Sequence, residues 1–405
     1  MRPTVIERDC VIAGGGPAGM VLGYLLARAG LRVSVLEKHA DFLRDFRGDT
    51  IHPSTLRLLR ELGLGEAFLE LPLSRVGSLD ASIDGVRFTV VDFTTLPEPD
   101  DFLVFAPQWD FLNFLAAEGA KLDGFDLHLS TAAEDLLVEQ GRVAGVLART
   151  GDELLEIRAR LTVAADGRSS VLRRRAGLRP IEFGAPLDVL WFHLPKPQAA
   201  PPPTLAYVSR NGVLLTLDRG TYYQAGMIIP KGSFDQLQQA GLPAFRARIA
   251  GSASHVVEAA ESIQSWDQVK LLSVQLNRLD TWHRPGFIAI GDAAHAMSPM
   301  FGVGVNYAIQ DAVALANAIH APLARGEAPD DVLATVQERR QRPVKKMQRL
   351  QRISHRGVIR AATAKGARAA PRPVTWLLHR FSPRIRRFMA QFIGFGYLPE
   401  RSAIR

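Results

Sequence analysis

Two glycine-rich turns are the parts of this sequence whose residue types and spacing point to chemistry. Near the N-terminus, GGGPAG places Gly14, Gly16 and Gly19 in the pattern G-x-G-x-x-G. Much later, GDAAHAMSPMFGVGVN begins at Gly291, directly after the apolar run FIAI. Glycine lets a backbone turn sharply and approach a phosphate closely, and the N–H groups that begin a following helix attract its negative charge. We therefore expect both turns to contact a phosphate-bearing ligand.

The elements around the first turn give its pattern a specific meaning. The strand-like run DCVIA precedes it, the helical run VLGYLLARAG follows, and LRVSVLEK is a second strand. In such a β–α–β unit, Gly14 allows the sharp turn, Gly16 the approach of a pyrophosphate, and Gly19 the packing of helix on strand. Glu37 ends the second strand, at the distance expected for an acid that binds a ribose 2′-hydroxyl. This predicts a dinucleotide site, either for FAD or for NAD; a tight turn without a ligand is the alternative.

The second turn supplies what a longer ligand would need. Asp292 could bind the ribityl chain of a flavin or a nearby hydroxyl group. The start of the next helix would offer backbone N–H groups around Gly302, Gly304, Val305 and Asn306. A helix N-terminus aimed at an isoalloxazine ring stabilises negative charge on the reduced flavin. One FAD that spans both turns explains them together, whereas NAD needs only the first.

Other residue types that carry chemistry form no familiar catalytic set. We find no Ser-His-Asp arrangement, no HExxH and no metal-ligand spacing, so we expect no bound metal. Cys10 is the single cysteine, so an internal disulfide is excluded. Because Cys10 lies in an apolar strand-like run, we expect it to be buried. No second G-x-G-x-x-G exists for a separate NAD(P)H domain.

Length and charge narrow the class of protein. With 405 residues, 47% of them hydrophobic, the chain can build two domains. The net charge of +8 is concentrated in arginines near the end, but no nucleic-acid module accompanies them, so we expect no nucleic-acid partner. No signal peptide and no apolar run of roughly 18 residues is present, which predicts a cytoplasmic protein. The basic, apolar stretch WLLHRFSPRIRRFMAQFIGFGY could rest on an anionic membrane, but we favour a helix packed on the FAD-binding domain with its arginines outward and no membrane contact.

Between the two turns the sequence changes to strand-like spacing. Four short runs, LDVLWFHLP, TLAYVSR, GVLLTL and TYYQAGMIIP, are separated by hairpin signals. GSLDASIDGVRFTVVDF, from Gly77, predicts an earlier hairpin that joins the same sheet. We therefore predict an α/β fold: a Rossmann-like FAD-binding domain interrupted by a mainly antiparallel β-sheet substrate domain, with a C-terminal helical segment. The expected boundaries are 1–75, 96–180 and 273–370 for the first domain, 76–95 and 181–272 for the second, and 371–405 for the segment.

The motifs together resemble a known family, the FAD-dependent aromatic hydroxylases of the p-hydroxybenzoate hydroxylase type, which are single-component flavoprotein monooxygenases. The resemblance rests on GGGPAG, on ADGRSS from Ala165, and on GDAAHAMSP through GVGVN, and it covers roughly residues 9–318. It implies non-covalent FAD and NAD(P)H as a transient co-substrate. It also implies O₂-dependent hydroxylation of an aromatic or polyketide-like small molecule through a flavin C4a-hydroperoxide. We expect a monomer or a homodimer.

The resemblance adds four residues to the expected cofactor site. Asp166 matches the DG motif, with the capping of a helix from Ser169 as the alternative. Arg47 and Gln108 match residues near the FAD phosphates, although a surface arginine and an amide at a helix start would look the same. Pro299 matches a bend beside the flavin. The expected set is Gly14, Gly16, Pro17, Ala18, Gly19, Glu37, Lys38, Arg47, Gln108, Asp166, Gly291, Asp292, Pro299, Gly302, Gly304, Val305 and Asn306. We expect His295 of the same motif to be structural rather than a catalytic base.

The substrate site is less well marked. Tyr222 and Gln224 share one face of a strand with Gly226, and we take these two as candidates for the substrate pocket, with ordinary sheet packing as the alternative. Trp191 and His193 share a face of another strand. No catalytic base is identified.

Two other functions stay open from the sequence alone. One is a flavin oxidoreductase of the same fold without oxygen insertion, such as a quinone or isoprenoid reductase. The other is a non-catalytic nucleotide-binding module. The absence of a W-x-W motif disfavours a flavin halogenase.

Overall fold

The computed structural model describes residues 3–43, 50–198, 205–209, 211–363 and 382–404. Its first sheet begins with a strand–helix–strand unit, the order that favours parallel pairing. Its strands follow the spatial order β19 (His283–Arg284), β20 (Phe287–Ala289), β11 (Glu153–Ala164), β1 (Thr4–Ala13), β2 (Val33–Leu36) and β8 (Phe125–His128). The five strands from β20 to β8 pair in parallel, and an antiparallel extension of β10 (Arg142–Thr150) and β9 (Thr131–Glu139) pairs with β11.

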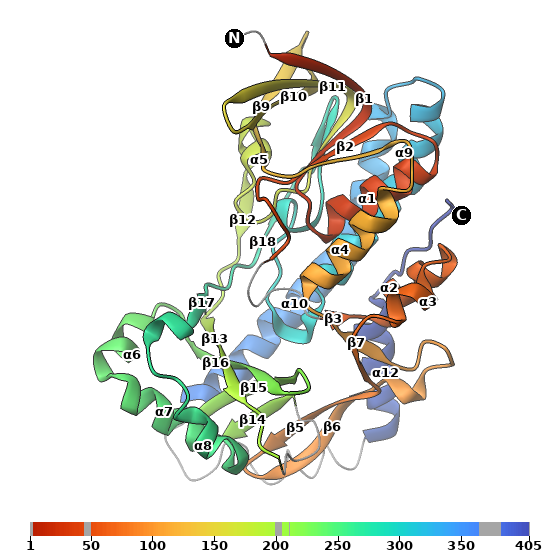
Figure 1. Ribbon diagram of the computed structural model, residues 1–405. Helices are drawn as coiled ribbons and strands as arrows, with labels where there is room; N and C mark the ends of the chain where they lie inside the picture. The colour runs from red at the N-terminus through yellow and green to blue at the C-terminus, as the bar shows by residue number, and fades with distance from the viewer. Residues whose placement is uncertain (1–2, 44–49, 199–204, 210, 364–381, 405) are drawn as a thin grey trace.

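Helices cover this parallel sheet, so its strands are buried on both faces. Residues Cys10–Ala13 of β1 are all buried, as expected for the continuous apolar runs of parallel strands. The helices packed around the sheet are α1 (Pro17–Arg28), α4 (Gln108–Gly119), α5 (Val171–Arg175) and α9 (Gly304–Ala324). Helix α1 lies between α4 and α9 and contacts both (Figure 1). The predicted burial of Cys10 is confirmed, and burial raises the pKa of its thiol.

A second, seven-stranded sheet lies beside the first (Figure 1). Its order is β17 (Lys270–Leu272), β13 (Leu187–Pro195), β16 (Tyr222–Pro230), β15 (Gly212–Asp218), β14 (Ala206–Ser209), β5 (Ser78–Ile83) and β6 (Val86–Asp92). All neighbours are antiparallel except β14 and β5. The prediction that the early hairpin joins this sheet is confirmed. We propose the domain boundaries given above for these two sheets.

The two faces of the second sheet bury different side chains. Tyr223 and Met227 of β16 pack in a core with helices α6 (Phe234–Ala240), α7 (Leu242–Ala250) and α8 (Val257–Ala260). Trp191 and Ile228 point the other way, into the core shared with the parallel sheet. Because side chains alternate along a strand, Gln224 and Gly226 lie on this second face. The face carrying the predicted substrate residues is therefore the one turned toward the first domain.

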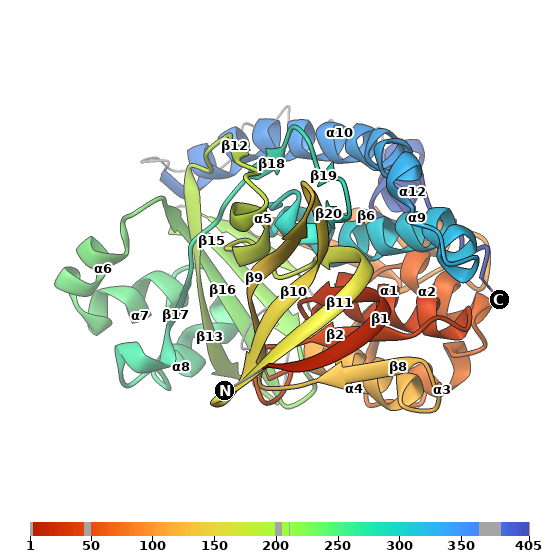
Figure 2. The same ribbon diagram turned by 90° about the horizontal axis from the view of Figure 1, so that it is seen from above.

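Smaller elements and two C-terminal helices complete the fold. The bounds are α2 (Pro53–Glu61) and α3 (Gly65–Leu69); β3 (Thr50–Ile51), β7 (Leu103–Phe105) and β4 (Ser74–Val76) in one small sheet; β12 (Pro180–Glu182) and β18 (Asn277–Leu279) in another; and the 3-10 turns η1 (Phe93–Thr95), η2 (Ser254–Val256), η3 (Trp266–Gln268), η4 (Gly291–Ala293) and η5 (Met300–Gly302). Helix α10 (Asp330–Thr363) runs along one side of the molecule and contacts α9, β14, β15 and β16 (Figure 2).

The C-terminal helix α12 (Ser382–Phe395) contacts β6, η1 and α2. It buries Ala390 and Ile393 and leaves Ile385 and Phe388 exposed. Helix α12 therefore packs on the protein through one face, but mainly against β6 of the second sheet and the adjacent η1, and less against α2 of the FAD-binding domain, where we expected it. Residues 376–381 of the basic stretch lie outside the described residues. In the ranges that the structure describes, no helix combines the length and apolar character needed to cross a membrane.

Candidate functional site

Four parallel strands end side by side, and each is followed by a predicted site residue. The strand ends Leu36, Ala13, Ala164 and Ala289 are paired in register across β2, β1, β11 and β20. The chain continues from them into Glu37, Gly14, Asp166 and Gly291, respectively. Ligands of open α/β sheets bind at the carboxyl ends of the strands. The strand order thus brings the first turn, the DG motif and the second turn to one edge.

The first turn is packed tightly at two of its glycines and open at the third. A Cβ on Gly14, which has φ +110°, would lie 2.3 Å from the carbonyl oxygen of Ala165. A Cβ on Gly19 would lie 1.9 Å from the carbonyl oxygen of Gly14. A Cβ on Gly16 meets no atom within 4 Å. The space beside Gly16, at the N-terminus of α1, can therefore receive a pyrophosphate.

Glu37 is held next to this turn. One oxygen of its carboxylate, Oε2, accepts a hydrogen bond from the Gly15 N–H at 3.1 Å, and the other, Oε1, accepts one from the His39 N–H at 3.1 Å. Lys38 is exposed beside it. The carboxylate is thereby fixed at the end of β2, the position at which a ribose hydroxyl would arrive.

Asp166 caps α5 and also has an unused oxygen. Its Oδ2 accepts hydrogen bonds from the N–H groups of Val171 at 2.7 Å and Leu172 at 3.2 Å. The capping expected as the alternative is thus present. Its Oδ1 is buried and has no partner among the described residues. Burial raises the pKa of Asp166 despite these hydrogen bonds, so a ligand that donates to Oδ1 would be favoured.

The second turn contacts the first through small residues. A Cβ on Gly291 would lie 3.3 Å from the Cβ of Ala18 in α1 and 3.2 Å from that of Ala308 in α9. Next to it, the Asp292 carboxylate accepts a hydrogen bond from the Arg168 Nε at 2.9 Å. Arg168 belongs to the ADGRSS motif, so an ion pair links the second and third motifs that carry the resemblance.

Beyond Pro299, the backbone is strained before α9 begins. Phe301 adopts φ +70° although it is not a glycine, and Gly302 follows with φ +61°. The Thr50 hydroxyl donates to the Gly302 carbonyl at 2.8 Å. No atom lies within 4 Å of a Cβ on Gly304, the first residue of α9. The space beside Gly304 can therefore receive a ligand, and contact of Gly304 and Val305 with the cofactor stays a prediction.

The Asn306 side chain is used within the protein. Its Oδ1 accepts hydrogen bonds from the His52 N–H at 3.1 Å and the Thr55 hydroxyl at 2.7 Å. Its Nδ2 donates to the Thr50 carbonyl at 3.3 Å. The backbone N–H of Asn306, in the first turn of α9, is therefore the group that we propose for cofactor contact.

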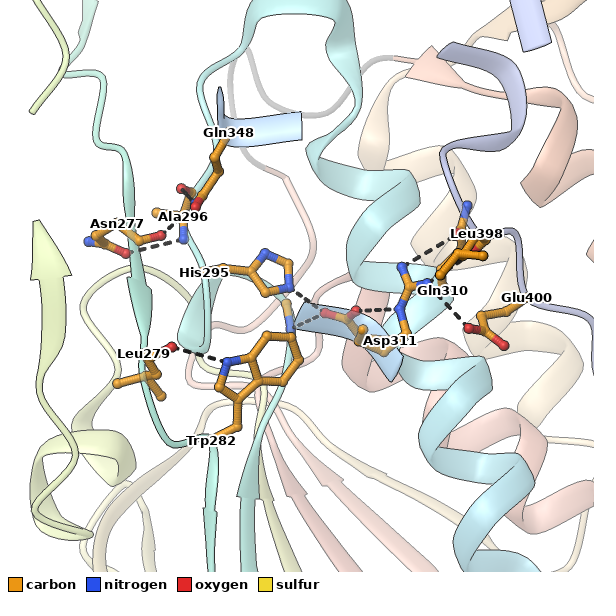
Figure 3. Close-up of polar contacts among 12 residues, drawn as sticks. Asn277, Leu279, Trp282, His295, Ala296, Gln310, Asp311, Gln348, Leu398 and Glu400 are labelled. Carbon is orange, nitrogen blue, oxygen red and sulfur yellow. Dashed lines mark hydrogen bonds and ion pairs between the residues drawn. The ribbon is translucent and has the colours of Figure 1, made fainter. Parts of the chain in front are cut away.

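A buried polar network around Asp311 of α9 binds the backbone of the second turn (Figure 3). The Asp311 carboxylate accepts the Gly291 N–H at 3.1 Å and contacts His295 Nε2 at 2.5 Å and Arg340 Nε at 2.9 Å. Burial alone would raise the pKa of Asp311, but the charges and hydrogen bonds of His295 and Arg340 outweigh it and lower the pKa. Arg340 also donates to the Leu398 carbonyl at 3.1 Å, near the C-terminus. His295 thus serves this network, which agrees with a structural role.

Sequence reasoning missed Asp311 and Arg340. The available signal was an acid in the middle of the apolar helical run AIQDAVALANAI, since a buried carboxylate requires a cationic or hydrogen-bonding partner. The partner lies in α10, a helix that the arginine-rich sequence alone did not reveal.

The substrate candidates lie on the inner face of the second sheet. Gln224 is buried, and its Oε1 accepts hydrogen bonds from Arg219 Nε at 3.2 Å and Nη2 at 2.9 Å. The Tyr222 ring packs edge-on against His193, with centroids 4.9 Å apart. Asp110 of α4 faces Arg219: burial raises the pKa of Asp110 and the arginine charge opposes that rise. Contact of Tyr222 and Gln224 with a substrate stays a prediction.

The structure does not test the predicted cofactor contacts of Arg47 and Gln108. Arg47 lies outside the described residues. Gln108 is half-buried at the first position of α4, where an amide at a helix start was the alternative. Within the described ranges, no three His, Cys, Asp or Glu side chains come together as metal ligands.

The residues of the site fit FAD. The open space at Gly16 suits a pyrophosphate, the unpartnered Asp166 oxygen suits a hydroxyl donor, and the open α9 N-terminus suits an electron-rich ring. All three lie on the connections that follow the aligned strand ends.

Comparison with known proteins agrees with this geometry. The sequence profile of a family described as FAD binding domain matches residues 7–351. The 6-methylpretetramide 4-monooxygenase of Streptomyces rimosus is 29% identical over 399 residues, covering 96% of this chain and 92% of that protein. Among solved structures, the anhydrotetracycline hydroxylase OxyS of Streptomyces rimosus matches with a TM-score of 0.75 and 22% identity, covering 96% of this chain and 76% of that one. The flavin-dependent brominase Bmp2 matches with a TM-score of 0.76 and 18% identity, covering 96% and 93%. At these identities the two structures show a shared fold.

Proposed function

The chain belongs to the FAD-binding-domain family of FAD-dependent monooxygenases, and we propose that it uses NAD(P)H and O₂ to hydroxylate an aromatic or polyketide-like small molecule. One observation carries the proposal. Four parallel strands end in register, and their connections gather Glu37, Gly14, Asp166 and Gly291 at one edge of the sheet. A ligand shorter than FAD would leave part of this edge unused.

Each part of the site has a distinct task in this proposal. The N-terminus of α1 at Gly16 binds the pyrophosphate, and Glu37 binds the adenosine ribose. Asp292, oriented by Arg168, binds the ribityl chain. Bound FAD supplies electron transfer from NAD(P)H and the activation of O₂. The open N-terminus of α9 stabilises negative charge on the reduced ring through its backbone N–H groups.

The second sheet is proposed to cover the substrate. Its inner face carries apolar and aromatic groups such as Trp191 and Tyr222, together with the amide of Gln224. Such a mixture binds a flat, apolar molecule and orients it through a few polar contacts. It also excludes water from the reacting atoms, which favours transfer of oxygen to the substrate over loss as hydrogen peroxide. The relative that acts on 6-methylpretetramide supports a polycyclic aromatic substrate.

Oxygen labelling tests the proposal. Purified protein is screened with phenolic and polycyclic compounds for faster NADPH or NADH oxidation, and hits are repeated under ¹⁸O₂ with product mass measured. The proposal predicts one ¹⁸O atom in the product. A reduced, unlabelled product would instead establish a flavin reductase of the same fold, and absence of flavin binding would reject both.

Because the fold resembles that of the brominase Bmp2, the same assay also tests for halogenation. A reaction with bromide present but without a halogenated product supports hydroxylation, whereas a brominated product refutes it. The absence of W-x-W from the sequence favours the first outcome.

A further inference from the structure

Helix α10 carries a buried polar row against the loop beside the expected flavin position. Gln348, Gln351 and His355 are spaced by three and four residues, so they share one face of the helix. Their exposed fractions are 1%, 0% and 1%. A buried amide or imidazole destabilises the fold unless its hydrogen bonds are made, so the partners of this row show its purpose.

Most of these partners lie in the loop that contains Pro299, although Gln348 also accepts a hydrogen bond from Arg278 Nη1 at 3.2 Å and donates to the Asn277 carbonyl. Gln351 accepts the Ser298 N–H at 3.3 Å through Oε1, and its Nε2 donates to the carbonyls of Ser298 at 3.0 Å and Met300 at 3.1 Å. Gln351 therefore binds the backbone on both sides of Pro299. The loop lies in neither a strand nor an α-helix, so these bonds replace those that regular structure would provide.

His355 and Gln348 extend the same contact in both directions. His355 Nε2 lies 2.8 Å from the Ser298 hydroxyl oxygen, which also accepts the Met300 N–H at 3.2 Å. Gln348 Nε2 donates to the carbonyls of Ala296 at 3.1 Å and Asn277 at 2.7 Å. The row thus holds the loop at Ala296, Ser298 and Met300, directly before Phe301 with its positive φ.

Apolar packing alone could hold α10 in place. Leu333, Val336, Val344 and Met347 of this helix are all buried in the main core. The polar row is therefore not required to hold the helix on the protein. Its hydrogen bonds instead fix the position of the loop. Because α10 also contacts β14, β15 and β16, it joins this loop to the proposed substrate sheet.

We propose that Gln351 and His355 are positioning residues, which set the Ser298–Gly302 backbone so that the α9 N-terminus meets the flavin ring. The inference rests on the proposed function in that FAD is the ligand. It adds the two side chains that orient the ring-binding segment without touching the ring.

Gln351→Met is the main test, and Gln337→Met is its matched control. Gln337 lies on the same helix and clamps another backbone segment in the same way: its Oε1 accepts the Trp282 N–H at 2.8 Å and its Nε2 donates to the Asp280 carbonyl at 2.8 Å. The apoproteins are titrated with FAD, and the affinity, the visible absorption spectrum and the reduction potential of the bound flavin are measured. We expect Gln351→Met to weaken FAD binding by about tenfold and to shift the spectrum. Gln337 is only half-buried, so we expect Gln337→Met to stay within about twofold of wild type in FAD affinity and to lose less thermal stability than Gln351→Met.

Substitutions at His355 separate positioning from general packing. In His355→Gln, an amide nitrogen can take the place of Nε2, so we expect FAD affinity within about threefold of wild type; in His355→Leu we expect a loss of at least fivefold. Ser298→Ala, which removes only the hydroxyl, gives an independent measurement if a helix variant fails to fold, and should shift the flavin spectrum in the same direction as His355→Leu.

Equal FAD affinities and spectra for Gln351→Met and Gln337→Met would overturn the inference, as would equal behaviour of His355→Leu and His355→Gln. Wild-type protein that binds no FAD would overturn both this inference and the proposed function. Wild-type protein that binds FAD but inserts no oxygen would reject the proposed function alone, because the titrations need no substrate.

Discussion

Replacing Arg340 by methionine should strongly destabilise the protein, because the guanidinium is fully buried between two carboxylates. Its Nε donates to Asp311 at 2.9 Å, and its Nη1 lies 3.3 Å from Glu400. Its Nη2 donates to the Gln310 amide oxygen at 3.2 Å. Methionine keeps the apolar stem but leaves these acceptors without their donor. Removal of one partner from a buried ion pair costs about 3–5 kcal/mol. We expect about 3 kcal/mol here, because His295 stays beside Asp311 and can share its charge.

Urea unfolding of the apoprotein at pH 7 measures this loss of unfolding free energy. The control is Arg325→Met, which breaks an exposed pair with Glu327 and should leave the midpoint unchanged. If Arg340→Met unfolds at the same urea concentration as Arg325→Met, the network in Figure 3 does not stabilise the second turn and our reasoning is wrong.

Three further predictions concern pH, the first turn and the second turn. Burial lowers the pKa of His52 from 6.5 to about 4, although its hydrogen bond to the Ile393 carbonyl opposes this shift. The unfolded chain therefore binds a proton on His52 more readily than the folded protein does. As a result, the free energy of unfolding has its full value above pH 6.5 and falls by about 3 kcal/mol as the pH drops to 4. Urea unfolding from pH 7 to 4 should show this slope in the wild type and a flatter one in His52→Asn. Gly16→Ala should fold normally but weaken FAD binding at least tenfold in a fluorescence titration, because its methyl group enters the open space, whereas Gly19→Ala should lose about 2 kcal/mol or more of stability through overpacking. Arg168→Gln, which releases Asp292, should raise the FAD dissociation constant about fivefold with little change in melting temperature; an unchanged constant would separate Asp292 from the cofactor.

The sequence predicted the elements of the fold because their signals are local. The glycine pattern between strand and helix, the hairpin signals at Asn211-Gly212 and the apolar run before Gly291 all act over a few residues, and each corresponds to an observed turn or strand end. The strand order could not be predicted in the same way. The placement of β20 beside β11 and of β11 beside β1 depends on contacts between residues far apart in the chain.

The same distinction applies to the site. The residues expected from the two glycine turns lie on connections at one sheet edge, since the motif itself defines their local geometry. The supporting residues Arg340, Gln351 and His355 lie on α10, where single polar residues within a basic, exposed-looking helix give no sign of what they contact. Asn306 shows the converse limit: its motif position is clear, but only the structure shows that Thr50, His52 and Thr55 use its side chain.

A crystal structure of the protein with FAD would show whether one cofactor spans both glycine turns. We expect the pyrophosphate at the open side of Gly16, the ribose at Glu37, and the isoalloxazine ring beside the backbone N–H groups that begin α9 after Gly302. A flavin bound elsewhere, or a ring far from the α9 N-terminus, would contradict this expectation.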